Sequence, residues 1–148
     1  MGLERTGIRT DPSAFVRNIY SVPPEMREIA VKCGLGANFA LTPLPYVKGK
    51  KTVITDDLIR SGEKMADIAQ KCRKMGAIEV HGLAGTIGRS TCPYGNASFI
   101  GQEMIGSGLE DKDIARSLGL DSFTSLTIPE LLMAVNTPRI NYCYICLE

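Results

Sequence analysis

Residues 52–76 read TVITDDLIRSGEKMADIAQKCRKMG, and this stretch decides the fold. The β-branched run at 51–55, which begins one residue before this stretch, is typical of a buried strand, and we expect the acids at 56 and 57 to end it. From Glu63 the apolar side chains recur at the spacing of one helix face: Met65, Ile68, Ala69, Cys72 and Met75. Gly76 then supplies a C-terminal cap. The stretch predicts a strand, a short loop and an amphipathic helix.

A second apolar run, IEVHGLA at 78–84, follows this helix and predicts another strand. Two strands joined by a helix form a βαβ unit, with parallel strands and a right-handed crossover. We expect one further helix near 110–118, ending at Gly119, and another opened by TIPE at 127–130, which has capping-box spacing and Pro in the first turn. The fold class is therefore α/β, with a parallel sheet on a βαβ core and helices toward the C-terminus.

The chain upstream of this core has a different character. Residues 2–20 are polar and irregular, which is typical of a loop or arm. After two prolines, residues 25–33 place apolar side chains at helical spacing, and Gly34 ends the predicted helix. We expect one partial domain in three segments: an arm or mobile loop at 1–23, the βαβ region at 24–91, and the C-terminal helices with a Cys-rich tail at 92–148.

Composition excludes several classes of protein. With 148 residues, 44% hydrophobic and 22% charged, the chain is neither disordered, collagen-like nor a coiled coil. A net charge of +1 implies no field that would attract nucleic acid or a membrane surface. We find no apolar run of signal or membrane-span length and expect a cytoplasmic protein. Five cysteines, an odd number, argue against a closed disulfide framework and for reduced thiols or metal ligands.

The acidic pair Asp56 and Asp57 lies where open α/β sheets bind ligands, beyond the carboxyl end of a strand. Such carboxylates can accept hydrogen bonds from sugar hydroxyls and can hold Mg²⁺. The loop at 58–62, with the N-terminus of a helix behind it, can cradle a phosphate. The alternative is a solvated turn that only caps the helix, and spacing alone leaves both interpretations open.

Residues 52–76 resemble the phosphoribosyl pyrophosphate (PRPP) motif of type I phosphoribosyltransferases. The order of the other motifs is similar to that of the amidophosphoribosyltransferase family, across nearly the whole chain but only the C-terminal part of the family's protein. The motifs are PEMREIAV at 24–31, CPYG at 92–95, QEMI at 102–105, IARSLGLDS at 114–122 and the tail Cys143-x-x-Cys146. Residues 17–20, RNIY, more loosely resemble the family's mobile active-site loop.

The resemblance implies a partial type I phosphoribosyltransferase-like sheet and a site for PRPP. Asp56 and Asp57 would be the catalytic pair, holding the ribose hydroxyls and Mg²⁺. The residues around the 5′-phosphate would be Arg60, Ser61, Gly62, Glu63 and Lys64. The family makes 5-phosphoribosylamine from PRPP and glutamine in purine biosynthesis.

Two segments of the family's protein have no counterpart in this chain. We see no glutaminase, since Gly2 stands where the processed enzyme has a Cys nucleophile, so ammonia would come from solution or from a glutaminase subunit. The first strands of the transferase domain would precede residue 1, and their absence would expose a strand edge. We therefore expect a partial sequence, or one half of a split enzyme that assembles with a complementary transferase subunit into an oligomer.

The PRPP motif departs from the family at Glu63 and Lys64, where small hydroxyl residues are expected. A carboxylate about 4 Å from a phosphate charge repels it by roughly 4 kcal/mol at an effective dielectric constant of 20. That is almost three orders of magnitude in affinity, part of which Lys64 would offset. The competing hypothesis is a degenerate, non-catalytic binding or assembly module that keeps the fold and an iron-sulfur or zinc site.

Three cysteines match ligand positions of the 4Fe-4S cluster that some members of the family carry: Cys92, Cys143 and Cys146. The fourth ligand would lie upstream of residue 1. Cys33 and Cys72 fall on apolar helix faces, where a free Cys behaves as a small hydrophobe. Two alternatives remain: structural zinc with His81 as the fourth ligand, or reduced thiols without metal.

Overall fold

The computed structural model describes residues 15–17, 39–41, 47–91, 104–136, 138 and 143–147. It divides into two compact units, Met1–Tyr46 and Val47–Glu148. In the first unit, strand β1 (Phe15–Arg17) pairs antiparallel with β2 (Phe39–Leu41). The helix predicted at 25–33 and most of the loop predicted at 17–20 lie outside the described residues.

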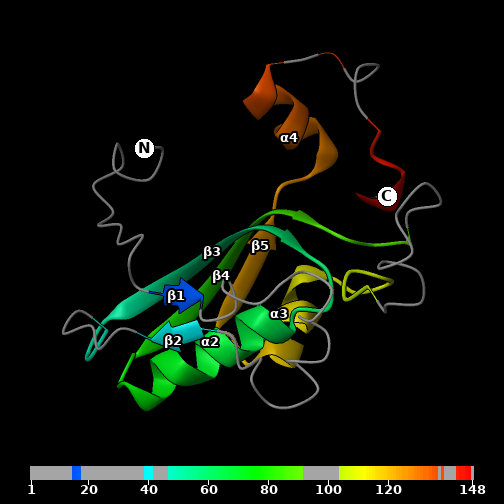
Figure 1. Ribbon diagram of the computed structural model, residues 1–148. Helices are drawn as coiled ribbons and strands as arrows, with labels where there is room; N and C mark the ends of the chain where they lie inside the picture. Colours follow the sequence, from blue (N-terminus) through cyan, green and yellow to red (C-terminus); the bar gives the residue numbers. More distant parts are fainter. Residues whose placement is uncertain are drawn as a thin grey trace. The chain divides into compact units, whose positions relative to one another are not determined.

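The second unit is built on a three-stranded parallel sheet (Figure 1). Its strands stand in the order β3-β4-β5, and both neighbouring pairs are parallel. Helix α2 connects β3 to β4, and helix α3 precedes β5. The bounds are β3 Lys51–Ile59, α2 Glu63–Lys74, β4 Glu79–Ile87, α3 Asp111–Leu118 and β5 Ser122–Ser125. The predicted α/β fold with a parallel βαβ core is confirmed.

The strands differ from the prediction in extent and number. The expectation that the acidic pair ends the first strand was wrong: β3 runs through both acids to Ile59, because its backbone keeps its pairing with β4. Asp56 lies opposite Ala84 and Ile59 lies opposite Ile87. β5 was not predicted. Its one buried residue, Phe123, gives no alternating pattern, and its strand form depends on pairing with β4.

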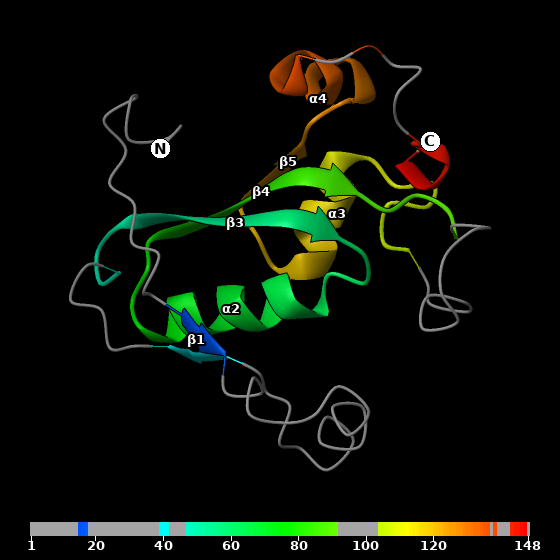
Figure 2. The ribbon, with the colours of Figure 1, turned by 45° about the horizontal axis from the view of Figure 1, so that its top comes forward.

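The core lies between the sheet and the two helices (Figure 2). Helix α2 buries Met65, Ile68, Ala69 and Cys72, as the periodicity predicted, whereas Met75 is half-buried and follows the last helical residue. Helix α3 buries Ile114, Ala115 and Leu118. Gly82 in β4 keeps room for this packing: a Cβ there would come within 2.8 Å of both Leu120 and Met65.

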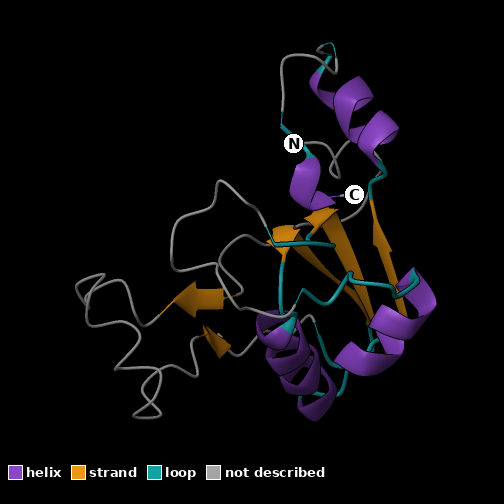
Figure 3. Cartoon of the chain, turned by 90° about the vertical axis from the view of Figure 1, so that its right-hand side faces the viewer, coloured by secondary structure: helices purple, strands orange, loops and turns teal. Residues whose placement is uncertain are grey.

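A third helix of this unit, α4 (Ile128–Val135), leads away from the carboxyl end of β5 (Figure 3). Its start confirms the predicted capping box. The backbone N–H of Thr127 donates to Glu130 Oε2 at 2.8 Å, and the N–H of Glu130 donates to Thr127 Oγ1 at 3.4 Å. No residue of α4 is buried, so its form depends on these local signals more than on packing.

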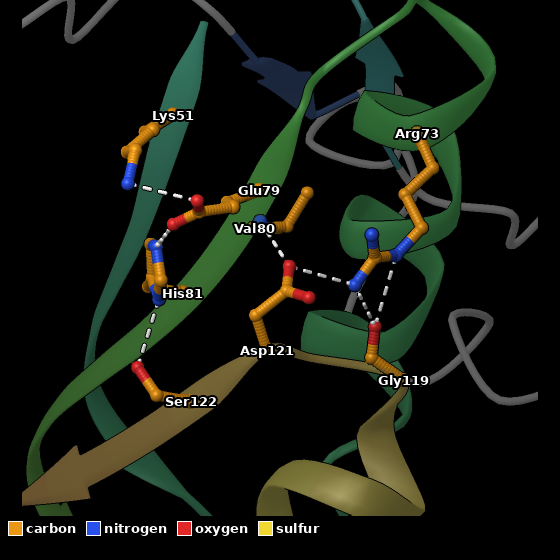
Figure 4. A network of polar contacts seen from close by, with 8 residues as sticks. All are labelled: Lys51, Arg73, Glu79, Val80, His81, Gly119, Asp121 and Ser122. Atoms are coloured by element: carbon orange, nitrogen blue, oxygen red, sulfur yellow. Dashed lines mark hydrogen bonds and ion pairs between the residues drawn. The ribbon is translucent and has the colours of Figure 1, made fainter.

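One carboxylate, that of Asp121, joins helix α2, strand β4 and the turn before β5 (Figure 4). Asp121 Oδ2 accepts the backbone N–H of Val80 at 2.7 Å and Nη2 of Arg73 at 2.9 Å. Arg73 also donates from Nη2 to the carbonyl of Gly119 at 3.0 Å. The Val80 N–H is the main cause that holds the pKa of Asp121 below its usual value.

We expect Asp121→Ala to lower the free energy of unfolding by about 1–3 kcal/mol, because the N–H of Val80 loses its acceptor. The loss should lie at the lower end of this range, because the Asp121 side chain is 39% exposed and its ion pair with Arg73 is screened by water. Urea denaturation measures the change. Asp67→Ala, which removes an i,i+4 ion pair with Lys71 on the same helix, is the matched control and should cost less than 1 kcal/mol. Equal losses in the two variants would contradict the role given to Asp121.

The wild-type protein and Asp121→Ala also differ in how their stability depends on pH. The pKa of Asp121 is lowered in the folded state, so its stabilisation is present above the unfolded value of about 3.9. It is lost as the pH falls through the lower, folded pKa. The stability difference between the wild-type protein and Asp121→Ala should therefore narrow on acidification below about pH 4.

Candidate functional site

The acidic pair lies near the carboxyl end of β3, ahead of a short loop that leads into α2. Asp56 and Asp57 are consecutive residues of the strand, which ends at Ile59, and α2 begins at Glu63. The Asp56 side chain is only 14% exposed, whereas Asp57 is exposed. All the residues predicted to surround PRPP, from Asp56 to Lys64, therefore belong to one strand, loop and helix start.

Hydrogen bonds and one ion pair hold the two carboxylates. Asp56 Oδ1 accepts the N–H of Asp57 at 3.2 Å, and Asp57 Oδ1 accepts the N–H of Leu58 at 2.8 Å. Asp56 Oδ2 forms an ion pair with Nζ of Lys64 in the first turn of α2. The pKa of Asp57 lies below its usual value, chiefly because the N–H of Leu58 bonds to its charged form. Asp57 is therefore ionised at neutral pH.

The loop between strand and helix depends on Gly62. Its φ of +78° lies in the left-handed region, and a Cβ there would come within 2.5 Å of Leu118 Cδ2 and 2.8 Å of Ile105 Cδ1. The carbonyl of Arg60 accepts the N–H of Ile105 at 2.8 Å, which fixes the other end of the loop. Only glycine satisfies both the conformation and the close packing.

The interpretation that the acids merely cap the helix was wrong. The residue at the N-cap of α2 is Gly62, and no side chain makes a capping hydrogen bond there. The first-turn N–H groups of a helix have no intrahelical partners and carry the positive end of its dipole. This end of α2 follows the loop directly. Ser61 and Glu63 flank Gly62 and are exposed.

The C-terminal tail docks beside the end of β4. The carbonyl of Cys146 accepts the N–H of Arg89 at 2.9 Å and that of Ser90 at 3.3 Å, and Ser90 Oγ donates to the carbonyl of Ile145 at 3.1 Å. The tail forms a short 3₁₀ helix, η5 (Ile145–Leu147). Cys92, which follows Ser90 closely in the chain, lies outside the described residues. Within the described segments no three His, Cys, Asp or Glu side chains are grouped around a metal position.

Both ring nitrogens of His81 have hydrogen-bond partners on the sheet (Figure 4). Its Nε2 lies 3.0 Å from Glu79 Oε2 and its Nδ1 lies 2.8 Å from Ser122 Oγ, while Lys51 pairs with Glu79 at 2.8 Å. Cys146 contacts Arg89, which follows the far end of β4, and the strand from His81 to its end at Ile87 spans roughly 20 Å at about 3.3 Å per residue. His81 therefore cannot share a metal ion with the tail.

Cys72 behaves as predicted for a core thiol. Its side chain is buried in the apolar face of α2, and burial raises the pKa of the thiol. Cys143 is exposed and Cys146 is half-buried. The tail cysteines thus remain accessible, while Cys72 does not.

Two cavities lie away from the acidic pair, and sequence reasoning missed both because β5 was not predicted. One, of about 290 Å³, lies at the carboxyl ends of β4 and β5; its lining includes Thr86, Arg89, Asp111, Ser125 and Leu147. The other, of about 430 Å³, lies between α3 and β5; its lining includes Lys112, Arg116, Asp121 and Ser122. Neither is lined by Asp56 or Asp57.

Comparison with known proteins agrees with this architecture, although no family model matches the chain. The amidophosphoribosyltransferase of Methanocaldococcus jannaschii is 33% identical over 138 residues, which is 90% of this chain and 27% of that protein. The chloroplastic amidophosphoribosyltransferase of Glycine max is 30% identical over 115 residues, 76% of this chain and 20% of that protein. The chain is a relative of the amidophosphoribosyltransferases. It spans only 20% to 27% of the length of these two relatives.

A solved structure shows the same fold. Glutamine PRPP amidotransferase from B. subtilis, complexed with ADP and GMP, matches 99% of this chain and 33% of its own with a TM-score of 0.77 and 24% identity. The resemblance to the amidophosphoribosyltransferase family is thus confirmed in sequence and in fold. Among the helices that the structure describes, none is long and apolar enough to cross a membrane.

We expect Gly62→Ala to destabilise the second unit by about 2–4 kcal/mol, because left-handed strain and overpacking against Leu118 add. The matched control is Gly108→Ala, at φ +68° with nothing within 4 Å of the added Cβ, which should show the strain alone. Thermal or urea denaturation of both variants measures the difference. Equal losses would show that the contacts with Leu118 and Ile105 do not constrain the loop.

Proposed function

We propose that this chain is an amidophosphoribosyltransferase-like segment that binds Mg²⁺-PRPP. It would take part in forming 5-phosphoribosylamine, in purine biosynthesis, if a partner chain or a missing segment completes the domain. One observation supports this most. In a relative of these enzymes, two adjacent acids lie near the end of a parallel strand and are followed by a glycine loop and a helix start without a side-chain cap.

The donor set suits the proposed ligands. Asp57 offers an exposed, ionised carboxylate, and Asp56 lies next to it, so hard oxygen donors are available for Mg²⁺ and for the two ribose hydroxyls. The backbone of residues 61–63 and the positive end of α2 are suited to a 5′-phosphate. A bound Mg²⁺ would neutralise charge on the departing pyrophosphate. Neutral ammonia is already a nucleophile, so the site needs no general base.

Glu63 weakens this site less than its charge suggests. It is the first residue of α2 and is exposed, so its carboxylate can extend into water, away from the loop backbone. The repulsion of roughly 4 kcal/mol calculated for a carboxylate about 4 Å from a phosphate is therefore an upper bound.

The nitrogen donor in this proposal is ammonia, free or supplied by a glutaminase subunit.

Calorimetric titration with PRPP in the presence of Mg²⁺ tests the proposal. We expect saturable heat for the wild-type chain and at least tenfold weaker binding for Asp57→Asn, which removes one charge from the metal and ribose ligands. The control is Asp67→Asn, which removes a carboxylate of α2 that pairs with Lys71, and this variant should bind PRPP like the wild-type chain. The absence of saturable heat in the wild-type chain would overturn the proposal. Binding without product when ammonia is added would favour the non-catalytic module.

For the tail we propose a structural 4Fe-4S cluster, with Cys143 and Cys146 as ligands together with Cys92. The docking of Cys146 onto Arg89 and Ser90 supports this, because the chain reaches Cys92 just after that contact. Thiolates are the usual ligands of such clusters. The cluster would fix the tail at the end of β4, and its fourth ligand would come from another polypeptide segment.

Anaerobic purification tests the cluster. We expect bound iron and broad visible absorbance from the wild-type protein, lost in Cys143→Ser and Cys146→Ser and kept in Cys72→Ala, whose thiol is buried in α2. Iron and zinc are measured by elemental analysis. Colourless protein with stoichiometric zinc would contradict the cluster and favour a zinc site. Protein without either metal would also contradict the cluster and favour reduced thiols without a metal.

A further inference from the structure

The first turn of α2 brings a positive charge to the acidic pair. Nζ of Lys64 forms an ion pair with Asp56 Oδ2, and the other oxygen of the same carboxylate accepts the N–H of Asp57 at 3.2 Å. Both oxygens of Asp56 therefore have partners within the protein. The charge of Lys64 also contributes to the lowered pKa of Asp57. The acidic pair is thus already partly neutralised by the protein itself.

This arrangement affects any cation that approaches the pair. A divalent cation must displace Lys64 to reach Asp56 Oδ2, or else bind through Asp57 alone beside a fixed positive charge. The Lys64 side chain is 43% exposed, whereas that of Asp56 is 14% exposed. A lysine ammonium is a point charge on a flexible stem, so Lys64 can leave Asp56 without movement of the helix.

The same turn is the phosphate end of the proposed PRPP site. A phosphate monoester beside the N-terminus of α2 carries more negative charge than one carboxylate and lies next to the backbone of Lys64. It therefore competes with Asp56 for the ammonium. Withdrawal of Lys64 toward the phosphate leaves Asp56 Oδ2 open to a divalent cation or a ribose hydroxyl.

We propose that Lys64 is an internal competitor of the divalent cation at Asp56, released when a phosphate group binds at the start of α2. The proposal rests on the proposed function, because it concerns the same site. Phosphate and cation then bind with positive coupling. By thermodynamic linkage the cation strengthens phosphate binding by the same factor.

Titration with Mn²⁺, followed by the electron paramagnetic resonance signal of the free ion, tests the coupling without turnover. Without phosphate, Lys64→Met should bind Mn²⁺ about tenfold more tightly than wild type, since one screened unit charge is removed. Lys64→Arg keeps the charge and should bind Mn²⁺ more weakly than Lys64→Met. Lys71→Met breaks the ion pair with Asp67 on the same helix and is the matched control, which should also behave like wild type.

Saturating ribose 5-phosphate is the second arm of the experiment. It should raise the Mn²⁺ affinity of the wild-type protein severalfold and that of Lys64→Met by less, since only the direct attraction between phosphate and Mn²⁺ acts there. Equal Mn²⁺ affinity of Lys64→Met and wild type without phosphate, or an equal effect of phosphate on the two proteins, would overturn the proposal, as would no Mn²⁺ binding by any variant. The measurement without phosphate uses no PRPP. Tighter Mn²⁺ binding by Lys64→Met can therefore be detected even if the chain fails to bind PRPP, so failure of this proposal and failure of the proposed function can be told apart.

Discussion

The parallel pairing of β3 with β4 is the constraint on which the candidate site depends. It extends from Lys51 opposite Glu79 to Ile59 opposite Ile87. Parallel strands need a crossover, and here α2 provides it. Because the pairing carries β3 past the acidic pair, only residues 60–62 remain to turn the chain into the helix. A turn this short accounts for the left-handed conformation of Gly62 and brings the first helical turn beside Asp56.

The features that could be predicted from the sequence are those with local causes. The buried face of α2 follows from side-chain spacing, and the start of α4 follows from Thr127 and Glu130. The αL conformation of Gly119 ends α3 where the sequence indicated. Each of these signals acts within a few residues of the chain, so no knowledge of the rest of the fold is needed to interpret it.

The features that could not be predicted depend on partners distant in sequence. Two adjacent acids resemble the end of a strand, and only the pairing with β4 shows that β3 continues. β5 buries Phe123 alone, and Asp121 beside it acts through Val80 and Arg73, which are far from it in the chain. The tail docks through main-chain carbonyls, whose partners no side-chain pattern records. Motif order identified the candidate site residues, but it could not show that Lys64 pairs with Asp56.

Glu63 and Lys64 carry opposite charges, so together they leave the net charge at the start of α2 unchanged, yet their positions make them act differently. Glu63 is exposed at the first position of α2, where the helix dipole favours a carboxylate. Lys64 instead reaches across to β3 and neutralises Asp56. The cost to phosphate binding that the sequence assigns to Glu63 is therefore reduced by exposure to water. Before any ligand binds, the main electrostatic effect of the pair therefore falls on the acidic residues, where a cation and a ribose would bind.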